Sequence, residues 1–132
     1  MIVLDASAAL EILLRAGNHP DLVDRVLRSG ETIAAPHLLD LEVAQVLRQF
    51  VMAGELAETR AREAIEDHLA LGIARYSHDG LLVRVWQLRG NCTAYDAAYI
   101  ALAEALDAVL VTCDGRLADV PGNRATVEVF RA

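Results

Sequence analysis

The 132-residue sequence contains no lysine, and all twelve of its basic residues are arginines. This absence excludes reactions that need a lysine, such as phosphate binding by a P-loop lysine, Schiff-base formation and phosphoaspartate chemistry. Aromatic residues make up only 5% of the chain, so its apolar bulk is mostly alanine, leucine and valine. The two cysteines, Cys92 and Cys113, lack metal-binding spacing, and we expect both to be small buried side chains.

Long apolar runs are also absent. No stretch approaches the roughly 20 apolar residues that a membrane-spanning helix needs. The start, MIVLD, reaches an acid without the basic segment of a signal peptide. The sequence therefore predicts a cytoplasmic protein that does not enter a membrane. Its 55% hydrophobic and 23% charged residues favour a single folded domain over 1–132.

Basic charge is scarce as well. The chain has 19 acids against 12 bases, which gives a net charge of −7. A surface that binds many phosphates would be basic, so this balance argues against broad binding of nucleic acid.

Short apolar runs alternate with longer amphipathic segments, a pattern that is typical of βαβ units around a parallel sheet. Pro20 suits the first turn of a helix, and Gly30 and Gly72 suit helix ends. The predicted strands cover 2–4, 32–35, 73–76, 108–112 and 126–130. The predicted helices cover 6–15, 20–29, 38–53, 58–71, 79–89 and 94–107.

Acidic residues follow two of the predicted strands. Asp5 comes directly after strand 2–4, and Asp114 follows strand 108–112 after one residue. Ligands gather beyond the carboxyl ends of the strands in open parallel sheets, so both acids are candidate site residues. Asp is also common in turns and as a helix N-cap, and a capping role alone is the alternative for each.

Two further acids lie on predicted helices. Thr93 and Asp96 resemble a capping box, yet Asp96 stands among apolar neighbours, where an ionised carboxylate needs hydrogen-bond donors or a cation. Capping leaves lone pairs of the carboxylate free for a ligand. On helix 38–53, Glu42 and Asp40 flank opposite sides of the apolar stripe, and helical periodicity does not choose between them.

Four segments carry a family resemblance: MIVLDASAAL, LEVAQVL, TAYDAAYIALAEAL and LVTCDGRLA. They closely resemble the motif blocks of PIN-domain ribonucleases and, more narrowly, those of VapC toxins of bacterial toxin–antitoxin modules. The resemblance covers essentially the whole chain. It implies an α/β fold in which helices flank a parallel sheet of strand order 3-2-1-4-5. That order brings Asp5 and Asp114 together where the strand order reverses.

The resemblance also implies which residues form the site. Its active centre consists of four acids, Asp5, Glu42, Asp96 and Asp114. Glu42 is selected over Asp40 because it begins the family's E-V-x-x-V-L pattern. Asp119 lies near Asp114 and is the alternative fourth acid.

Other polar residues are expected to assist these acids. Three of them match polar positions of the family and are expected to support the carboxylates: Ser7, Asn91 and Thr112. Three arginines near the motif blocks are the candidates for RNA contacts: Arg84, Arg89 and Arg116.

Neighbouring carboxylates cannot all stay ionised without help, and Mg²⁺ or Mn²⁺ would relieve their repulsion with the oxygen ligands that such hard cations prefer. The expected reaction is hydrolysis of RNA by a metal-activated water. We expect Asp5 and Asp96 to be the strongest ligands, and Glu42 and Asp114 to complete the shell or orient the water. The four histidines show no ligand spacing and are expected at the surface or at helix caps.

The resemblance further implies a cognate VapB-type antitoxin that covers the acids, a homodimer, and transfer or ribosomal RNA as the substrate. Two alternatives stay open. A PIN module without its metal would act as a binding or scaffold protein, although the complete set of acids argues against it. A phosphoaspartate switch or phosphatase also carries an acid after its first strand. The absence of lysine, and Ser7 where such phosphatases usually have a second Asp, disfavour that alternative.

Overall fold

The computed structural model describes residues 1–131. Within them, the parallel strands form one sheet in the order β3-β2-β1-β4-β5, which confirms the predicted fold and strand order. The strands are β1 (Ile2–Leu4), β2 (Ile33–Pro36), β3 (Ala74–Tyr76), β4 (Val109–Thr112) and β5 (Val127–Val129). The first strand of the chain is therefore the central strand of the sheet. It pairs with β2 on one side and with β4 on the other.

The helices follow the predicted pattern, with one division. They are α1 (Ala6–Arg15), α2 (Pro20–Leu27), α3 (Leu38–Met52), α4 (Glu58–Leu69), α5 (Leu82–Gln87) and α6 (Ala94–Leu106). The segment predicted as a single helix at 79–89 consists of a 3-10 turn, η2 (Asp79–Leu81), followed by the short α5. Two further 3-10 turns, η1 (Ala16–Asn18) and η3 (Gly115–Asp119), were not predicted.

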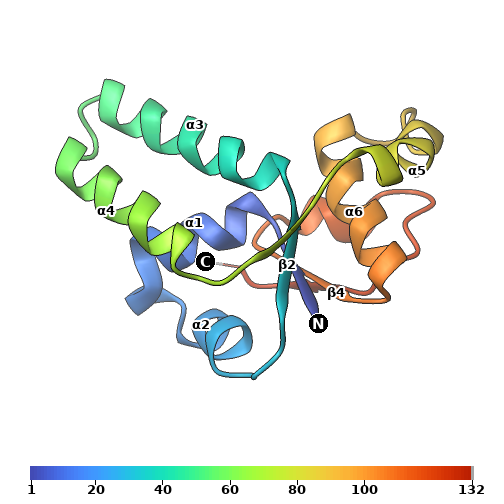
Figure 1. The fold of residues 1–132 in the computed structure, drawn as a ribbon, viewed down its shortest axis with the longest axis horizontal. Helices are drawn as coiled ribbons and strands as arrows, with labels where there is room; N and C mark the ends of the chain where they lie inside the picture. The colour runs from blue at the N-terminus through green and yellow to red at the C-terminus, as the bar shows by residue number, and fades with distance from the viewer. Residues whose placement is uncertain (132) are drawn as a thin grey trace.

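Helices cover both faces of the sheet. Figure 1 shows α3 and α4 side by side on one side of β2, and α5 and α6 on the other. Ile2, Val3 and Leu4 of β1 are consequently fully buried, as expected for a central strand of a parallel sheet. Helix α6 packs on β1, β2 and β4, and seven successive residues from Ala97 to Ala103 are buried. A helix segment that is apolar all round belongs inside the protein, whereas the first and last turns of α6 are partly exposed.

His37 and His78 occupy helix N-cap positions, as expected. His19 also precedes a helix, but it is buried at 7% exposure and its side chain contacts Glu11 instead of capping the helix. The expectation was wrong for His68, which is buried within α4 at 2% exposure. Its Nε2 lies 2.7 Å from Oδ1 of Asp40, and this polar partner makes burial of the ring tolerable.

The expectation for the cysteines holds only in part. Cys92 and Cys113 are half-buried thiols that pack against the core. No helix among residues 1–131 is both long and apolar enough to span a membrane.

Candidate active site

Three of the four predicted acids lie at starts of helices. Asp5 directly follows β1 and is the N-cap of α1, where its side chain accepts a hydrogen bond from the amide of Ala8. Asp114 follows β4 after one residue and is the N-cap of η3. Asp96 lies in the first turn of α6, and Thr93 caps this helix with a 3.1 Å hydrogen bond from the amide of Asp96. Because β1 and β4 are paired neighbours, Asp5 and Asp114 share one edge of the sheet.

Asp5 is the most firmly held of the acids. Its carboxylate is 5% exposed. Oδ1 accepts hydrogen bonds from the Ser7 hydroxyl at 2.8 Å and from the Ala8 amide at 3.0 Å, and Oδ2 accepts one from the Thr112 hydroxyl at 2.5 Å. Burial raises the pKa of Asp5 above its ordinary value, and these three hydrogen bonds oppose the rise.

The two hydroxyl groups also join the chain segments on either side of the acid. The Ser7 hydroxyl accepts a hydrogen bond from the Cys113 amide, and the Thr112 hydroxyl accepts one from the Asp114 amide, each at 2.9 Å. Ser7 and Thr112 therefore fix Asp5 and the turn after β4 relative to each other. Asn91, the third predicted supporting residue, instead donates to the carbonyl of Pro121 at 2.9 Å and makes no hydrogen bond with an acid in the described chain.

The charge of Asp114 acts on two of the other acids, Asp5 and Asp96. Burial raises the pKa of Asp96, and the negative charge of Asp114 adds to the rise while Arg116 opposes it. Asp114 also raises the pKa of Asp5. Its own pKa is lowered, because the Arg116 guanidinium donates to both of its oxygens, at 3.0 Å from Nε and 2.6 Å from Nη2. Asp114 rather than the exposed Asp119 thus faces the other acids.

Glu42 approaches the same group from α3. Its Oε1 accepts a 2.6 Å hydrogen bond from the hydroxyl of Tyr99, which lies in α6 three residues after Asp96. Tyr99 is 2% exposed. Burial raises the pKa of its hydroxyl far above the ordinary value, and the charges of Glu42, Asp5 and Asp96 contribute to the rise. The hydroxyl therefore stays protonated and faces three of the four acids. Tyr99 was not among the residues predicted for this site.

Asp40, which periodicity could not separate from Glu42, belongs to a different cluster. Its Oδ1 contacts Nε2 of His68 on α4, and its Oδ2 accepts a hydrogen bond from Nε of Arg75 on β3, each at 2.7 Å. These two partners lower the pKa of Asp40 against the effect of burial. The structure thus directs Glu42 towards Tyr99 and the acids, and Asp40 towards α4 and β3.

The donor set of the acid edge, which we define as Asp5, Glu42, Asp96 and Asp114, suits a hard divalent cation because it consists of carboxylate oxygens. The mutual repulsion of these carboxylates also favours a cation. Across residues 1–131, however, no three acidic, histidine or cysteine side chains converge closely enough to form a ready-made metal cage. The acid edge therefore fits Mg²⁺ or Mn²⁺ in charge and donor type without enclosing a preformed cavity for it.

The three arginines predicted to contact RNA lie in different settings. Arg84 joins α5 to α6 through Glu104, with nitrogen–oxygen distances of 2.7 and 3.1 Å, and also donates to the Gly122 carbonyl. Arg89 stacks over the ring of Trp86 at 4.7 Å. Arg116 is 84% exposed and contacts Asp114. Of the three, only Arg116 lies at the acid edge.

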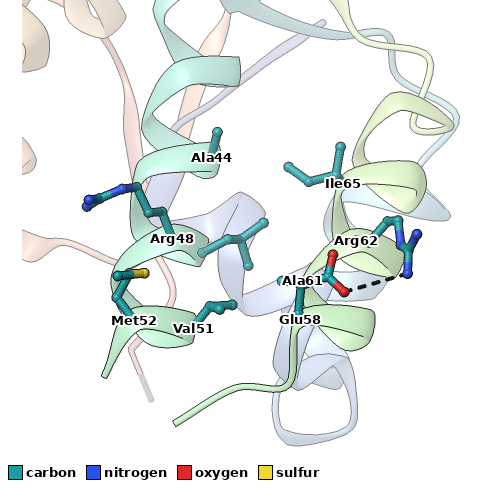
Figure 2. A pocket seen from close by; sticks show the side chains of 9 residues that line it. Ala44, Arg48, Val51, Met52, Glu58, Ala61, Arg62 and Ile65 are labelled. Atoms are coloured by element: carbon teal, nitrogen blue, oxygen red, sulfur yellow. Dashed lines mark ion pairs between the residues drawn. The ribbon is translucent and has the colours of Figure 1, made fainter. Parts of the chain in front are cut away.

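A pocket lies between α3 and α4, and none of the four acids of the acid edge lines it (Figure 2). We call it the α3–α4 groove, and its lining residues are Ala44, Leu47, Arg48, Val51, Met52, Glu58, Ala61, Arg62 and Ile65. Its acid, Glu58, faces Arg62 across one turn of α4 at 3.6 Å. A mostly apolar lining without a nucleophile or a group of acids has no means to activate water.

Comparison with known proteins identifies the family of the chain. The family model described as "PIN domain" matches residues 2–123. Ribonuclease VapC9 of Mycobacterium tuberculosis is 44% identical over 119 residues, which cover 90% of each chain. Ribonuclease VapC1 of the same species is 42% identical over 131 residues, covering 98% of this chain and 97% of the relative.

Solved structures share the fold at low sequence identity. The DNA-bound VapBC complex of Salmonella typhimurium contains a chain that matches with a TM-score of 0.73 and 16% identity, covering 97% of this chain and 96% of that one. VapC20 of Mycobacterium tuberculosis, described as a sarcin–ricin loop cleaving toxin, matches with a TM-score of 0.65 and 12% identity, covering 90% and 94%. Together with the sequence relatives, these matches show that the chain belongs to the PIN-domain family, among its VapC-type ribonucleases.

Proposed function

We propose that this protein is a metal-dependent endoribonuclease and the toxin of a toxin–antitoxin module. The observation that carries the proposal is the acid edge. There Asp5 is buried among three hydrogen-bond donors, and the negative charge of Asp114 contributes to raising its pKa. Burial of a carboxylate is costly, and a fold that keeps several of them together at the carboxyl end of its strands provides a site for a cation. The ribonuclease relatives support RNA as the substrate.

Asp5, Glu42, Asp96 and Asp114 would hold Mg²⁺ or Mn²⁺. When bound, such an ion polarises the phosphodiester and lowers the pKa of a water that attacks in line. Groups of the chain itself orient these carboxylates and favour their ionised forms. Donors on both sides of Asp5 fix the plane of its carboxylate, and the positive end of the α6 dipole favours the ionised form of Asp96.

RNA contacts must come from local positive charge, because the net charge of the chain is −7. Arg116 is exposed beside Asp114 and can approach a phosphate next to the bond that is cut. A site with so little basic surface should recognise a particular RNA shape or loop, and transfer or ribosomal RNA are the proposed substrates. The description of VapC20 as a toxin that cleaves one RNA loop supports this proposal.

A VapB-type antitoxin is the proposed inhibitor. The Salmonella typhimurium and Rickettsia felis structures of the same fold are VapBC complexes, which supports a partner of this type here. We also propose a homodimer. The apolar side chains of Val83 and Trp86 on α5 are 75% and 68% exposed, and pairing of two copies would remove them from water.

Cleavage of RNA by the purified protein tests the nuclease proposal. Fragments should form with Mg²⁺ or Mn²⁺ and should disappear with a chelator or in the variant Asp5→Asn. Asp119→Asn makes the same chemical change at an exposed acid outside the acid edge, and should cleave as the wild type does. Equal cleavage by Asp5→Asn and wild type would refute the assignment. Sequencing of RNA ends after induced expression would then identify the RNA and the position of the cut.

A further inference from the structure

We propose that Tyr99 is a positioning residue that holds the Glu42 carboxylate at the acid edge through its hydroxyl, which donates to Oε1 at 2.6 Å. The inference rests on the proposed metal-dependent function and assigns a task in it to a residue outside the four acids. Asp96 and Tyr99 stand three residues apart on α6, so their side chains emerge on the same side of that helix.

The position of the hydroxyl argues for a specific role. Tyr99 is 2% exposed in the most apolar helix of the described chain, where the ring alone would fill the space. A buried phenol hydroxyl needs a partner, and in the described residues this partner is Glu42. Phenylalanine would avoid that requirement. The hydrogen bond to the Glu42 carboxylate therefore explains why a hydroxyl is present at this buried position.

The same bond gives Glu42 its place. Glu42 has a long, flexible side chain, and the Tyr99 hydroxyl is its hydrogen-bond donor in residues 1–131. The bond links two helices across 57 residues of sequence. In Figure 1, α3 and α6 begin at the same end of the molecule on either side of β2. Without the hydroxyl, the charge of Glu42 would turn away from the other acids towards water.

A comparison with Asp40 shows why a neutral donor matters. Asp40 lies two residues before Glu42 on α3 and is held by the guanidinium of Arg75 together with His68. A cationic partner neutralises a carboxylate and competes with a metal ion for it. Tyr99 orients Glu42 without adding positive charge, so the negative charge of Glu42 stays available to a cation. Partners of this kind behind metal ligands tune metal affinity.

Mn²⁺ binding without RNA, measured by calorimetry or by electron paramagnetic resonance of free Mn²⁺, tests the inference. In Tyr99→Phe, the dissociation constant for Mn²⁺ should rise roughly tenfold or more. The Mn²⁺ concentration for half-maximal cleavage should rise by a similar factor, while kcat at saturating Mn²⁺ stays near that of the wild type. Tyr76→Phe is the matched control, because Tyr76 packs against the core and its hydroxyl makes no hydrogen bond to the described part of the chain. It should change neither quantity.

A double-mutant cycle separates positioning from a general loss of packing. If Tyr99 acts through Glu42, Tyr99→Phe should have no further effect on Mn²⁺ affinity in a Glu42→Ala background. Equal weakening in both backgrounds would overturn the inference, and so would unchanged Mn²⁺ affinity in the single variant Tyr99→Phe. In those two cases the wild type still binds Mn²⁺ and the proposed function stands. A wild type that binds no Mn²⁺ would refute both.

Discussion

The acid edge and the α3–α4 groove share helix α3 but are held together by different forces. At the acid edge, Asp5 depends on a hydrogen bond from Thr112, 107 residues away in sequence. The groove is lined by apolar side chains from two helices that follow each other directly, and Met52 at its rim is 72% exposed. The acid edge thus depends on polar contacts between segments that are distant in the sequence. The helix pair α3 and α4 depends instead on apolar packing between neighbouring segments. Substitutions at the acid edge and in the α3–α4 groove should therefore change different properties of the protein.

The largest effect on stability is expected from substituting a buried residue that lines the α3–α4 groove. Leu47 is 2% exposed and lies on its floor, so Leu47→Ala should lower the free energy of unfolding by about 2–5 kcal/mol. The folded fraction should nevertheless cleave RNA at the wild-type rate, because Leu47 lines the α3–α4 groove and is not part of the acid edge. Urea unfolding, together with cleavage assays well below the unfolding midpoint, measures both quantities.

Met52→Ala is the matched control for Leu47→Ala. It removes an exposed side chain of the same groove and should change the free energy of unfolding by no more than about 0.5 kcal/mol. A large loss of cleavage in folded Leu47→Ala would contradict the separation of the two regions.

Burial of Asp5 at the acid edge should make the stability of the metal-free protein depend on pH. Burial raises the folded-state pKa of Asp5 above 3.8. The stability linked to such a group is fully present below its unfolded pKa and is lost as the pH rises through its folded pKa. At neutral pH, Asp5→Asn should therefore unfold at a higher temperature than the wild type, and this difference should shrink as the pH falls through the raised pKa.

Thermal unfolding in the presence of a chelator measures this difference. Comparing the two proteins at each pH removes the contribution of acids that both share. One of these is Glu104, whose lowered pKa means that its stabilisation is lost only as the pH falls below its ordinary value of 4.5. A difference that grows on acidification would show that Asp5 is stabilised by its surroundings when ionised.

The smallest effect concerns Arg116, which contacts Asp114 and competes there with any other cation. Arg116→Ala should tighten Mn²⁺ binding by a factor of roughly two to five, and should leave thermal stability unchanged because the guanidinium is exposed. Arg89→Ala is a suitable control, since Arg89 stacks on Trp86 away from the acids. Weaker Mn²⁺ binding in Arg116→Ala would instead assign Arg116 a supporting role for Asp114.

Much of the fold could be predicted from the sequence because each element carries a local signal. The apolar runs of the strands, Pro20 at the start of α2 and Thr93 as the cap of α6 all match the structure. The division of 79–89 could not be predicted, because its apolar residues continue through the junction between η2 and α5.

The candidate site could be predicted less completely than the fold, because its contacts join segments that are distant in the sequence. Periodicity placed Glu42 and Asp40 symmetrically, and only the family resemblance selected Glu42. Their partners on α6, α4 and β3 give the physical distinction. Tyr99 resembles any core residue of an apolar helix until Glu42 is seen opposite its hydroxyl. Likewise, nothing near Arg84 in the sequence indicates its ion pair with Glu104, 20 residues later.

The central position of β1 has a consequence for synthesis of the protein. The strand leaves the ribosome well before its neighbour β4, which spans Val109–Thr112. An unfinished polypeptide already contains Asp5, Glu42 and Asp96, but it lacks the hydroxyl of Thr112 that anchors Asp5. A nascent chain that has not reached β4 therefore lacks the contact that anchors Asp5, and the acid edge can form only after β4 has been synthesised.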